Sequence, residues 1–390
     1  MYVDGDWVRA KGTTLGADNG IGVATILAIL DSTDIPHPAI DALFTIDEET
    51  GMTGALGLQG GFLEGQILLN LDTEDDDEIS IGCAGGVDVT SKGTYETESS
   101  VAGLTTMKLE LTGGSGGHSG MDIHKGIANA NKLMNRLLLV AYDAIDFRIK
   151  ELSGGGLRNA IPRESHCTVV MDPSDCDAFV TCMNEEFEKV AAEYKTTDAD
   201  LHWSCQESSN PPGEVLSESV QESLLLAIQA CPMGIHRMSP DIPNLVQTSN
   251  NLARVHVCEG IISIQCLCRS SVNSEKDDHA RSIASAFALA GLDTEYSGVY
   301  PGWTPNPSSD IVATMKALYE EKYGEEPRVI ACHAGLECGI LGTNYPEMDM
   351  VSFGPNIRGA HSPDECVQIS SVQKFWDYLL DALQRIPVKK

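Results

Sequence analysis

Short apolar strands and helices alternate near both ends of the 390-residue chain, and this pattern limits the possible folds more than any other feature. Alternating strand and helix units predict a mostly parallel sheet with helices on both faces. The fold class is therefore predicted to be α/β with a mixed, mostly parallel sheet. The expected helices cover residues 20–30, 310–323 and 370–386, and the expected strands cover residues 42–46, 66–71, 328–332 and 350–353.

The middle of the chain follows a different pattern. Residues 105–112 (TTMKLELT) alternate between apolar and polar side chains, as in a strand with one solvent-exposed face. A helix is expected at residues 126–142, and strands are expected at 166–171 and 261–267. These elements predict a separate α+β domain that interrupts the first one.

The change of pattern near Gly85 and its reversal near Gly298 locate the domain boundaries. One domain is expected to comprise residues 1–88 and 297–390, and the inserted domain residues 89–296. Two domains agree with a chain of this length, since single domains typically have about 100–200 residues.

The formal net charge of −31 arises from 57 acidic and 26 basic residues. Such a chain repels the phosphates of nucleic acids and the anionic surfaces of membranes, so neither partner is expected. The sequence has no stretch of the roughly 18 apolar residues that a membrane-spanning helix needs. Residues 1–7 also lack the basic start and apolar run of a signal peptide.

The twelve cysteines do not show the paired C-x-x-C spacing of a structural zinc site. Unpaired thiols in this number are typical of a reducing compartment. A cytoplasmic location is therefore predicted.

Acidic residues follow the expected strands of the first domain. Glu48 and Glu49 come after residues 42–46, and Asp72 comes after residues 66–71. Reactive groups in such sheets lie beyond the carboxyl ends of the strands, where these carboxylates are expected. Asp18 lies in a glycine-flanked turn before a helix, and His361 follows a strand and a glycine-rich loop.

Each of these residues also has a structural interpretation. An aspartate before a helix usually caps it, acidic runs are most often solvated loops, and a single histidine is more often structural than a ligand. Taken together, four carboxylates and one imidazole form a set that zinc accepts. In a two-zinc site, one glutamate ligates while its neighbour acts as general base on water.

Several long motifs show a resemblance to a known family. They are GTTLGADNGIG, TIDEETGMTGALGL, NLDTEDDDEISIGCAGG, GGHSGMDIHKGIANANKLM, GGGLRNAIPRE, VIACHAGLECGIL, YPEMDMVSFGP and GAHSPDE. They span the chain from residue 2 to its end. The chain resembles the aminoacyl-histidine dipeptidases, also called cytosol non-specific dipeptidases, which are relatives of the carnosinases, aminoacylases and glutamate carboxypeptidases.

The resemblance implies a role for each metal-site residue. Asp18 would bridge two zinc ions, and Glu48 would be the general base. Glu49 and His361 would ligate one ion, and Asp72 the other. Cobalt or manganese could replace zinc, because carboxylate-rich sites accept several divalent ions.

The resemblance also implies residues that meet the dipeptide substrate. His118 would stabilise the oxyanion of the tetrahedral intermediate from across a homodimer formed through the inserted domain. Arg269 would bind the substrate's C-terminal carboxylate, with Asn159 in the same pocket. His333 and Glu337 would line the substrate site, and Glu337 would meet the free amino group.

The chain departs from the family at its start. Members carry a His-x-Asp segment before the GTTLGADNG turn, whereas the first histidine of this chain is His37. About a hundred residues of a family member are therefore expected to be missing. One metal site keeps Asp18, Glu49 and His361, and the other keeps only Asp18 and Asp72, so one or two zinc ions are expected.

Three functions remain open from the sequence. The first is a metal-dependent dipeptidase that cleaves Xaa-His and other dipeptides. The second is an aminoacylase or another amidase of the same clan. The third is a catalytically impaired remnant that only dimerises, which the absent His-x-Asp segment favours and the intact Glu48-Glu49 pair opposes.

Overall fold

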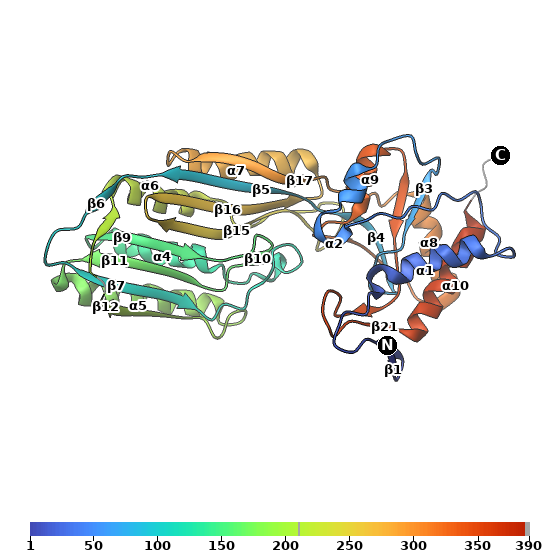
Figure 1. The fold of residues 1–390 in the computed structure, drawn as a ribbon, viewed down its shortest axis with the longest axis horizontal. Coiled ribbons are helices and arrows are strands. Elements are labelled where there is room, and N and C mark those ends of the chain that lie inside the picture. Colours follow the sequence, from blue (N-terminus) through green and yellow to red (C-terminus); the bar gives the residue numbers. More distant parts are fainter. Residues whose placement is uncertain (210, 387–390) are drawn as a thin grey trace. The chain divides into compact units, whose positions relative to one another are not determined.

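The computed structural model describes residues 1–209 and 211–386, without the side chain of Thr50. The chain divides into two compact units (Figure 1). Unit 1 comprises Met1–Ala84, Pro240–Leu245 and Pro301–Lys390, and unit 2 comprises Gly85–Ser239 and Val246–Tyr300. The expected inserted domain is continuous from residue 89 to 296, whereas Pro240–Leu245 belongs to unit 1; the domains and their roles stay predictions.

Unit 1 is built on a mixed four-stranded sheet. Its strands are ordered β18-β4-β19-β3, and both outer pairs, β18 with β4 and β19 with β3, run parallel. The central contact between β19 and β4 is antiparallel. The predicted α/β class with a mixed, mostly parallel sheet is confirmed. The strands are β3 (Ile67–Asn70), β4 (Glu78–Cys83), β18 (Arg328–Cys332) and β19 (Asp349–Ser352).

Helices cover both faces of this sheet because successive strand residues point to opposite sides. Val351 packs into a core with helices α1, α8 and α10, whereas its neighbour Met350 packs on the other side with residues of α9. Short helix α3 joins α9 there through Ala55. The helices of unit 1 are α1 (Ala17–Asp31), α2 (Glu48–Gly51), α3 (Thr53–Gly57), α8 (Asp310–Tyr323), α9 (Glu337–Asn344) and α10 (Ile369–Arg385).

A second, antiparallel sheet of unit 1 has the order β1-β2-β21-β20. It joins the start of the chain to the segment around His361. Its strands are β1 (Tyr2–Asp4), β2 (Trp7–Arg9), β20 (Ile357–Arg358) and β21 (Cys366–Gln368).

One predicted strand is wrong. Residues 42–46 form no strand, and Phe44 and Ile46 are 45% and 73% exposed. The apolar content of ALFTI indicated a buried strand, but a strand needs a neighbour that supplies backbone hydrogen bonds. No strand in the described part of the chain pairs with this segment.

Unit 2 contains two copies of one βαββαβ arrangement. In the first, the strands are ordered β12-β7-β11-β9, which is 4-1-3-2 in chain order; in the second, β15-β16-β5-β17 is 2-3-1-4. The first module comprises β7 (Thr105–Thr112), α4 (Ala130–Tyr142), β9 (Phe147–Gly154), β11 (Ser165–Met171), α5 (Cys176–Tyr194) and β12 (His202–Ser208). The second comprises β5 (Gly85–Thr94), α6 (Glu218–Ala230), β15 (Val246–Cys258), β16 (Ile261–Ser270), α7 (Asn273–Ala288) and β17 (Asp293–Tyr300).

The first module is inserted into the second, between β5 and α6. Short strands β6 (Thr97–Ser99) and β13 (Glu214–Leu216) pair where the chain enters and leaves it. Antiparallel pairing of β9 with β15 joins the two modules into one sheet. The remaining elements are β8 (Gly117–His118), β10 (Ala160–Ile161), β14 (Gly234–Met238) and 3-10 helices at Ile123–Lys125 and Pro173–Asp175.

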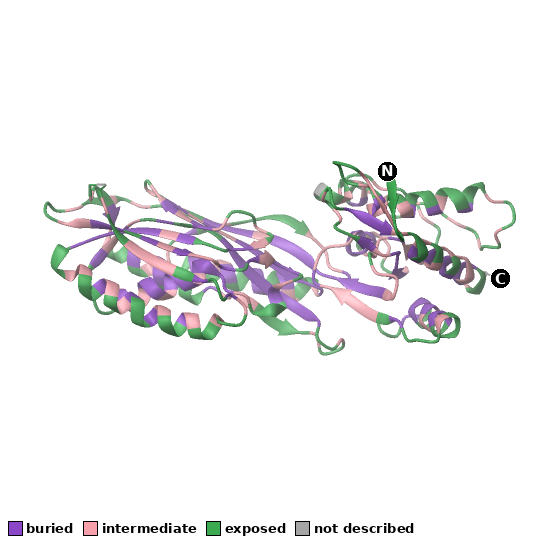
Figure 2. Cartoon of the chain, turned by 90° about the horizontal axis from the view of Figure 1, so that it is seen from below, coloured by how far each residue is buried: buried purple, intermediate pink, exposed green. Residues whose placement is uncertain are grey.

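The four long helices of unit 2 lie against the sheet and share one core with it. Buried residues concentrate where strands and helices face each other (Figure 2). Phe147, Phe179 and Leu225 from this core are fully buried. No helix among the described residues is both long and apolar enough to span a membrane. All twelve cysteines are free thiols.

Candidate metal centre

Asp18 lies in the first turn of α1, which begins after Gly16 in a left-handed conformation (φ 77°). Glycine adopts such a conformation without steric cost. The buried Glu365 carboxylate accepts hydrogen bonds from the Gly16 and Asp18 N–H groups at 2.8 and 3.1 Å. Burial opposes its charge, but these and neighbouring N–H bonds lower the pKa of Glu365. The turn is therefore held by an ionised carboxylate from near the end of the chain.

Glu48 and Glu49 occupy the first turn of the short helix α2. The Glu48 side chain is half-buried, whereas Glu49 is exposed. Burial, followed by the charges of Glu49, Glu337 and Asp18, raises the pKa of Glu48 to about 7. Neighbouring residues of one turn thus occupy different electrostatic surroundings.

Asp72 follows strand β3 and accepts a hydrogen bond from Asn19 Nδ2 at 2.8 Å. Asn19 Oδ1 in turn accepts a hydrogen bond from the Gly22 N–H at 2.9 Å. Burial and the charges of Glu48 and Asp18 raise the pKa of Asp72 well above its usual value. The side chain of Asn19 therefore links the start of α1 to the end of β3.

Glu337 begins helix α9, just after β18. Its Oε2 accepts a hydrogen bond from Thr45 Oγ1 at 2.7 Å, while Oε1 is buried and has no hydrogen-bond partner among the described residues. Burial raises the pKa of Glu337. His333, also predicted for the substrate site, is buried in the segment between β18 and α9.

His361 completes the cluster. Its Nε2 lies 3.1 Å from Asp18 Oδ2 and 2.7 Å from Glu49 Oε2. The residue has a left-handed backbone (φ 63°), which is rare for a residue other than glycine and is frequent at functional sites. Burial lowers the pKa of His361, but Glu49 and Asp18 outweigh it and raise that pKa.

Ligand atoms of Asp18, Glu49 and His361 all lie within 4.8 Å of one another. Carboxylate oxygen and imidazole nitrogen are ligands that zinc and other divalent ions accept. Burial is the largest cause that raises the pKa of Glu48 and of Asp72, and repulsion from neighbouring carboxylates adds to it in both. The residues therefore fit a divalent metal ion, which would remove this repulsion.

A cavity of about 700 Å³ opens beside the cluster, within unit 1. Asp18, Glu48, Glu49, Asp72 and Glu337 line its acidic part. Most of the rest of its wall is apolar, with contributions from α1, residues 38–45 and β3 that include Val23, Ile26, Leu30, Leu43 and Leu69. The cavity is large enough for a small peptide.

Three other predicted residues lie together in unit 2. His118, in β8, pairs with Ala160 of β10, and the Ser119 N–H donates to the Asn159 carbonyl at 2.7 Å. Arg269 Nε donates to Ser119 Oγ at 3.4 Å. Asn159 is exposed, whereas Arg269 is 4% exposed.

The hydrogen bonds of His118 determine its tautomer. Nδ1 accepts from the N–H groups of Gly120 and Met121 at 3.2 and 3.0 Å, so the proton of the neutral ring lies on Nε2. Burial, followed by the charge of Arg269, lowers the pKa of His118. A neutral ring with an Nε2–H donor suits an oxyanion-binding role, while the Nδ1 contacts also fit a histidine that only holds the backbone of its own loop.

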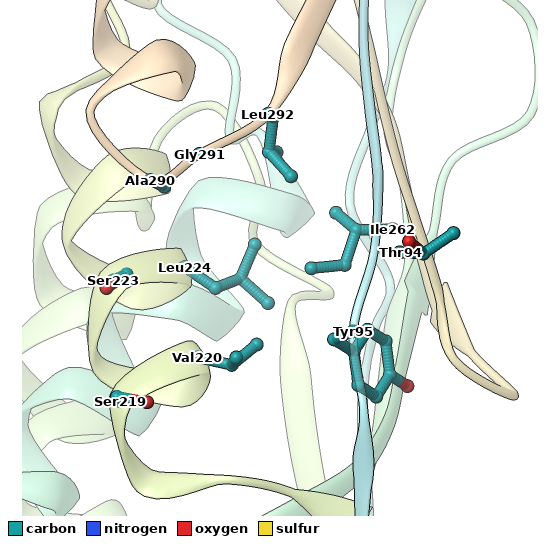
Figure 3. Close-up of a pocket in the computed structure, with 10 residues that line it drawn as sticks. All are labelled: Thr94, Tyr95, Ser219, Val220, Ser223, Leu224, Ile262, Ala290, Gly291 and Leu292. Atoms are coloured by element: carbon teal, nitrogen blue, oxygen red, sulfur yellow. The ribbon is translucent and has the colours of Figure 1, made fainter.

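A second cavity, smaller than the one in unit 1, lies in unit 2 and measures about 180 Å³ (Figure 3). Leu224 and Val220 of α6 face Ile262 and Leu292 across it, and Tyr95 lies beside them. Of the ten predicted site residues, all of which the structure describes, none lines this cavity.

Asn19, Thr45 and Glu365 contact the site but are absent from the predicted set. Asn19 follows Asp18 directly, and Glu365 ends the GAHSPDE motif, so both stand next to predicted residues. Their roles depend on contacts between distant segments, such as the 347 residues that separate Asp18 from Glu365. No local pattern reports such contacts.

The chain belongs to peptidase family M20/M25/M40, whose family model matches residues 2–385. It is similar to the cytosol non-specific dipeptidase of Escherichia coli (strain K12), with 41% identity over 388 residues, which covers 100% of this chain and 80% of that protein. The solved structure of the aminoacylhistidine dipeptidase of Vibrio alginolyticus matches with a TM-score of 0.94 and 44% identity, covering 100% of this chain and 79% of that one.

An aminopeptidase structure from Bacillus cereus matches with a TM-score of 0.51 and 14% identity over 98% of this chain and 75% of that one, which shows the shared fold alone. The recognised family is therefore confirmed. These matches do not support the expected N-terminal truncation.

Proposed function

We propose that this chain hydrolyses dipeptides, Xaa-His among them, with a divalent metal ion held by Asp18, Glu49 and His361. The observation that carries the proposal is the convergence of these three side chains, with ligand atoms within 4.8 Å, from segments far apart in the sequence. The relatives named as dipeptidases support the substrate class. Zinc is the proposed ion, and Asp72 would serve a second ion beside Asp18.

Glu48 is the proposed general base. A bound divalent ion would polarise the scissile carbonyl and the attacking water. Glu48 would take a proton from that water and pass it to the leaving amine as the C–N bond breaks. Burial is the largest cause of the raised pKa of Glu48, and a partly buried carboxylate suits a group that takes up a proton and then gives it back.

The remaining roles are proposed on the same basis. His118 Nε2–H would donate to the oxyanion, and Arg269, with Asn159, would bind the C-terminal carboxylate. Glu337, with the buried Oε1, would accept from the substrate's amino group, beside His333. Homodimerisation and a cytoplasmic location are also part of the proposal; the free cysteines support the location.

The decisive experiment measures metal content and hydrolysis together. The 390-residue protein is loaded with zinc, and the cleavage of Ala-His and of N-acetyl-alanine is followed by chromatography. We expect one or two zinc ions per chain and preferential cleavage of Ala-His. Faster cleavage of N-acetyl-alanine would indicate an aminoacylase, and background rates on both substrates in metal-loaded protein would indicate an inactive remnant.

A matched pair of variants tests the ligand assignment. His361→Asn removes an imidazole from the convergent set and should lose bound zinc. His37→Asn changes an exposed histidine whose Nδ1 lies 2.7 Å from the Pro38 carbonyl oxygen, and it should bind zinc as the wild type does. Equal zinc content in both variants would overturn the proposed site.

A further inference from the structure

Arg269 carries a buried positive charge without a carboxylate partner among the described residues. It is the penultimate residue of β16, and it is only 4% exposed. Its Nη1 donates to the Tyr300 hydroxyl at 2.7 Å, and its other bond is the long one to Ser119 Oγ. Asp88 is paired with Arg158 at 3.3 Å; burial raises the pKa of Asp88, and the charges of Arg158 and then Arg269 oppose this. A buried guanidinium with neutral partners is costly unless an anion joins it.

Three adjacent strands place Tyr300 beside Arg269. Arg269 of β16 pairs with Gly86 of β5, and Gly86 pairs with Tyr300 of β17. The three residues thus form one row across the sheet, with glycine in the middle. Paired residues on neighbouring strands point to the same face, so the tyrosine can reach the arginine only across Gly86.

Gly86 leaves the space that the tyrosine ring occupies. A Cβ atom at this position would lie 2.6 Å from the Cε1, Cζ and hydroxyl oxygen atoms of Tyr300. Real atoms do not approach so closely, so any side chain at Gly86 would displace the ring. The absence of a side chain in the central strand therefore determines where the Tyr300 hydroxyl lies.

The backbone of Tyr300 is also held. Lys276 of α7, which is 3% exposed, donates from Nζ to the Tyr300 carbonyl at 3.0 Å. The ladder between β17 and β5 is irregular just before this residue and resumes at it. Helix, strand and glycine together fix one position for the hydroxyl.

We propose that Tyr300 is a positioning residue that orients the Arg269 guanidinium toward the C-terminal carboxylate of the substrate. This inference rests on the proposed dipeptidase function and on Arg269 as its carboxylate receptor. By accepting the Nη1 hydrogen bond, Tyr300 fixes one edge of the guanidinium fork, and the substrate carboxylate meets the other edge. Gly86 contributes to this positioning, because the absence of a side chain there leaves space for the Tyr300 ring.

The test compares a substrate with and without the carboxylate. Tyr300→Phe keeps the ring and removes only the hydroxyl. We expect its KM for Ala-His to rise about ten-fold, as a lost hydrogen bond to a charged group implies, with kcat nearly unchanged. Its KM for Ala-His amide, which has no carboxylate, should stay at the wild-type value. Tyr296→Phe, at an exposed tyrosine of the same strand, is the matched control.

A second variant and a binding measurement complete the test. Gly86→Ala displaces the ring and should raise the KM for Ala-His in the same selective way. Calorimetry then compares histidine with histidinamide as product-like ligands, independently of turnover. Tyr300→Phe should weaken the binding of histidine about ten-fold and leave the binding of histidinamide unchanged.

The outcomes separate the two proposals. Wild-type protein that cleaves no dipeptide would overturn the proposed function, and the role of Tyr300 would still be supported if Tyr300→Phe weakens the binding of histidine but not of histidinamide. Active wild-type enzyme with equal KM changes for Ala-His and its amide in Tyr300→Phe would overturn the role of Tyr300. Equal wild-type binding of histidine and histidinamide would do the same, because Arg269 would then receive no carboxylate.

Discussion

Adjacent glutamates of helix α2 differ in burial, and their proposed roles differ accordingly. Glu49 is exposed and contacts His361 at 2.7 Å, as a ligand of a shared ion would. Glu48 is half-buried, and burial and its acidic neighbours raise its pKa to about 7. In the proposed mechanism, one turn of helix therefore supplies both a metal ligand and a proton acceptor.

The first prediction concerns the proposed base. Glu48→Gln should lower kcat for Ala-His by about 10²–10⁴-fold, because glutamine cannot accept the proton. Zinc content should not change, since Glu48 is not one of the three convergent ligands. Steady-state kinetics and metal analysis on the same sample measure both quantities. Glu347→Gln, at an exposed glutamate, is the control, and an active Glu48→Gln enzyme would refute the role.

The second prediction concerns Glu365. Glu365→Gln removes the charge and one of the two carboxylate acceptors that bind the N–H groups of Gly16 and Asp18. Urea unfolding should show a loss of about 1–3 kcal/mol, and zinc should bind more weakly because the Asp18 turn loosens. Asp364→Asn alters the exposed neighbouring carboxylate and should match the wild type. Unchanged zinc affinity in Glu365→Gln would show that the turn holds without it.

At the residue scale, motif resemblance predicted most of the metal cluster. Asp18, Glu49 and His361 lie in quoted motifs, and the structure brings them together. Asn19 and Thr45 were not predicted, because their importance lies in bonds to Asp72 and Glu337 that no motif encodes. The motifs therefore predict the acidic side chains of the site but not the neutral side chains of Asn19 and Thr45 that bind to them.

At the element scale, helices and paired strands were predictable where the apolar pattern and the hydrogen-bonding partner agree. Helix α8 and strand β18 begin and end at the expected residues. Helix α4 begins at Ala130, later than expected, because Asn129 caps it by accepting from the Lys132 N–H. The predicted strand at residues 42–46 is wrong because apolar content alone does not supply a strand that pairs with it.

Helix α7 carries a buried histidine with unusual surroundings. The centroid of the His279 ring lies 4.2 Å from that of His236 in β14, and both nitrogens of His279 are buried with no hydrogen-bond partner in the described part of the chain. Burial, followed by the charge of His236, lowers the pKa of His279 to about 4, although Glu275 and Asp278 oppose this. The folded protein therefore keeps the ring neutral at pH values where an unfolded chain protonates it.

The third prediction follows from this difference. An unfolded histidine has a pKa near 6.5, so between about pH 6.5 and pH 4 the unfolded state binds the extra proton and stability falls as the pH falls. The stabilisation is fully present above pH 6.5. Between pH 7 and pH 4.5, the free energy of unfolding of His279→Leu should fall by about 2–3 kcal/mol less than that of the wild type.

Urea midpoints at the two pH values measure the effect. His124→Leu, at an exposed histidine, should lose stability with pH as the wild type does. Parallel losses in His279→Leu and the wild type would show that the buried ring does not carry the acid sensitivity.

At the scale of the whole molecule, the proposed metal ligands and the largest hydrophobic core belong to different units. Unit 1 holds Asp18, Glu49 and His361, while the largest buried cluster lies within unit 2. A ligand stabilises only the unit that must be folded to bind it. The two units therefore differ in how they respond to metal removal.

The fourth prediction is that calorimetry shows two unfolding transitions and that zinc raises the melting temperature of one of them. At a hundred times its Kd, zinc stabilises unit 1 by about 2.7 kcal/mol, whereas the transition of unit 2 should not move. Trp203 is the tryptophan of unit 2, while Trp7, Trp303 and Trp376 belong to unit 1, so Trp203→Phe identifies the transitions by fluorescence. A zinc shift that persists in His361→Asn would contradict the assignment.

The nested arrangement of unit 2 has a consequence for the order in which the protein assembles. Strand β5 is synthesised before the embedded module, whereas its partners β16 and β17 come after it. During synthesis both edges of β5 therefore lack their hydrogen-bonding partners at a stage when all four strands of the embedded module are already made. When β6 pairs with β13, the long intervening chain is drawn together at its base, which lowers the entropy cost of closing the outer ladder. The embedded module can therefore fold first, and the outer strands β5, β16 and β17 pair with one another last.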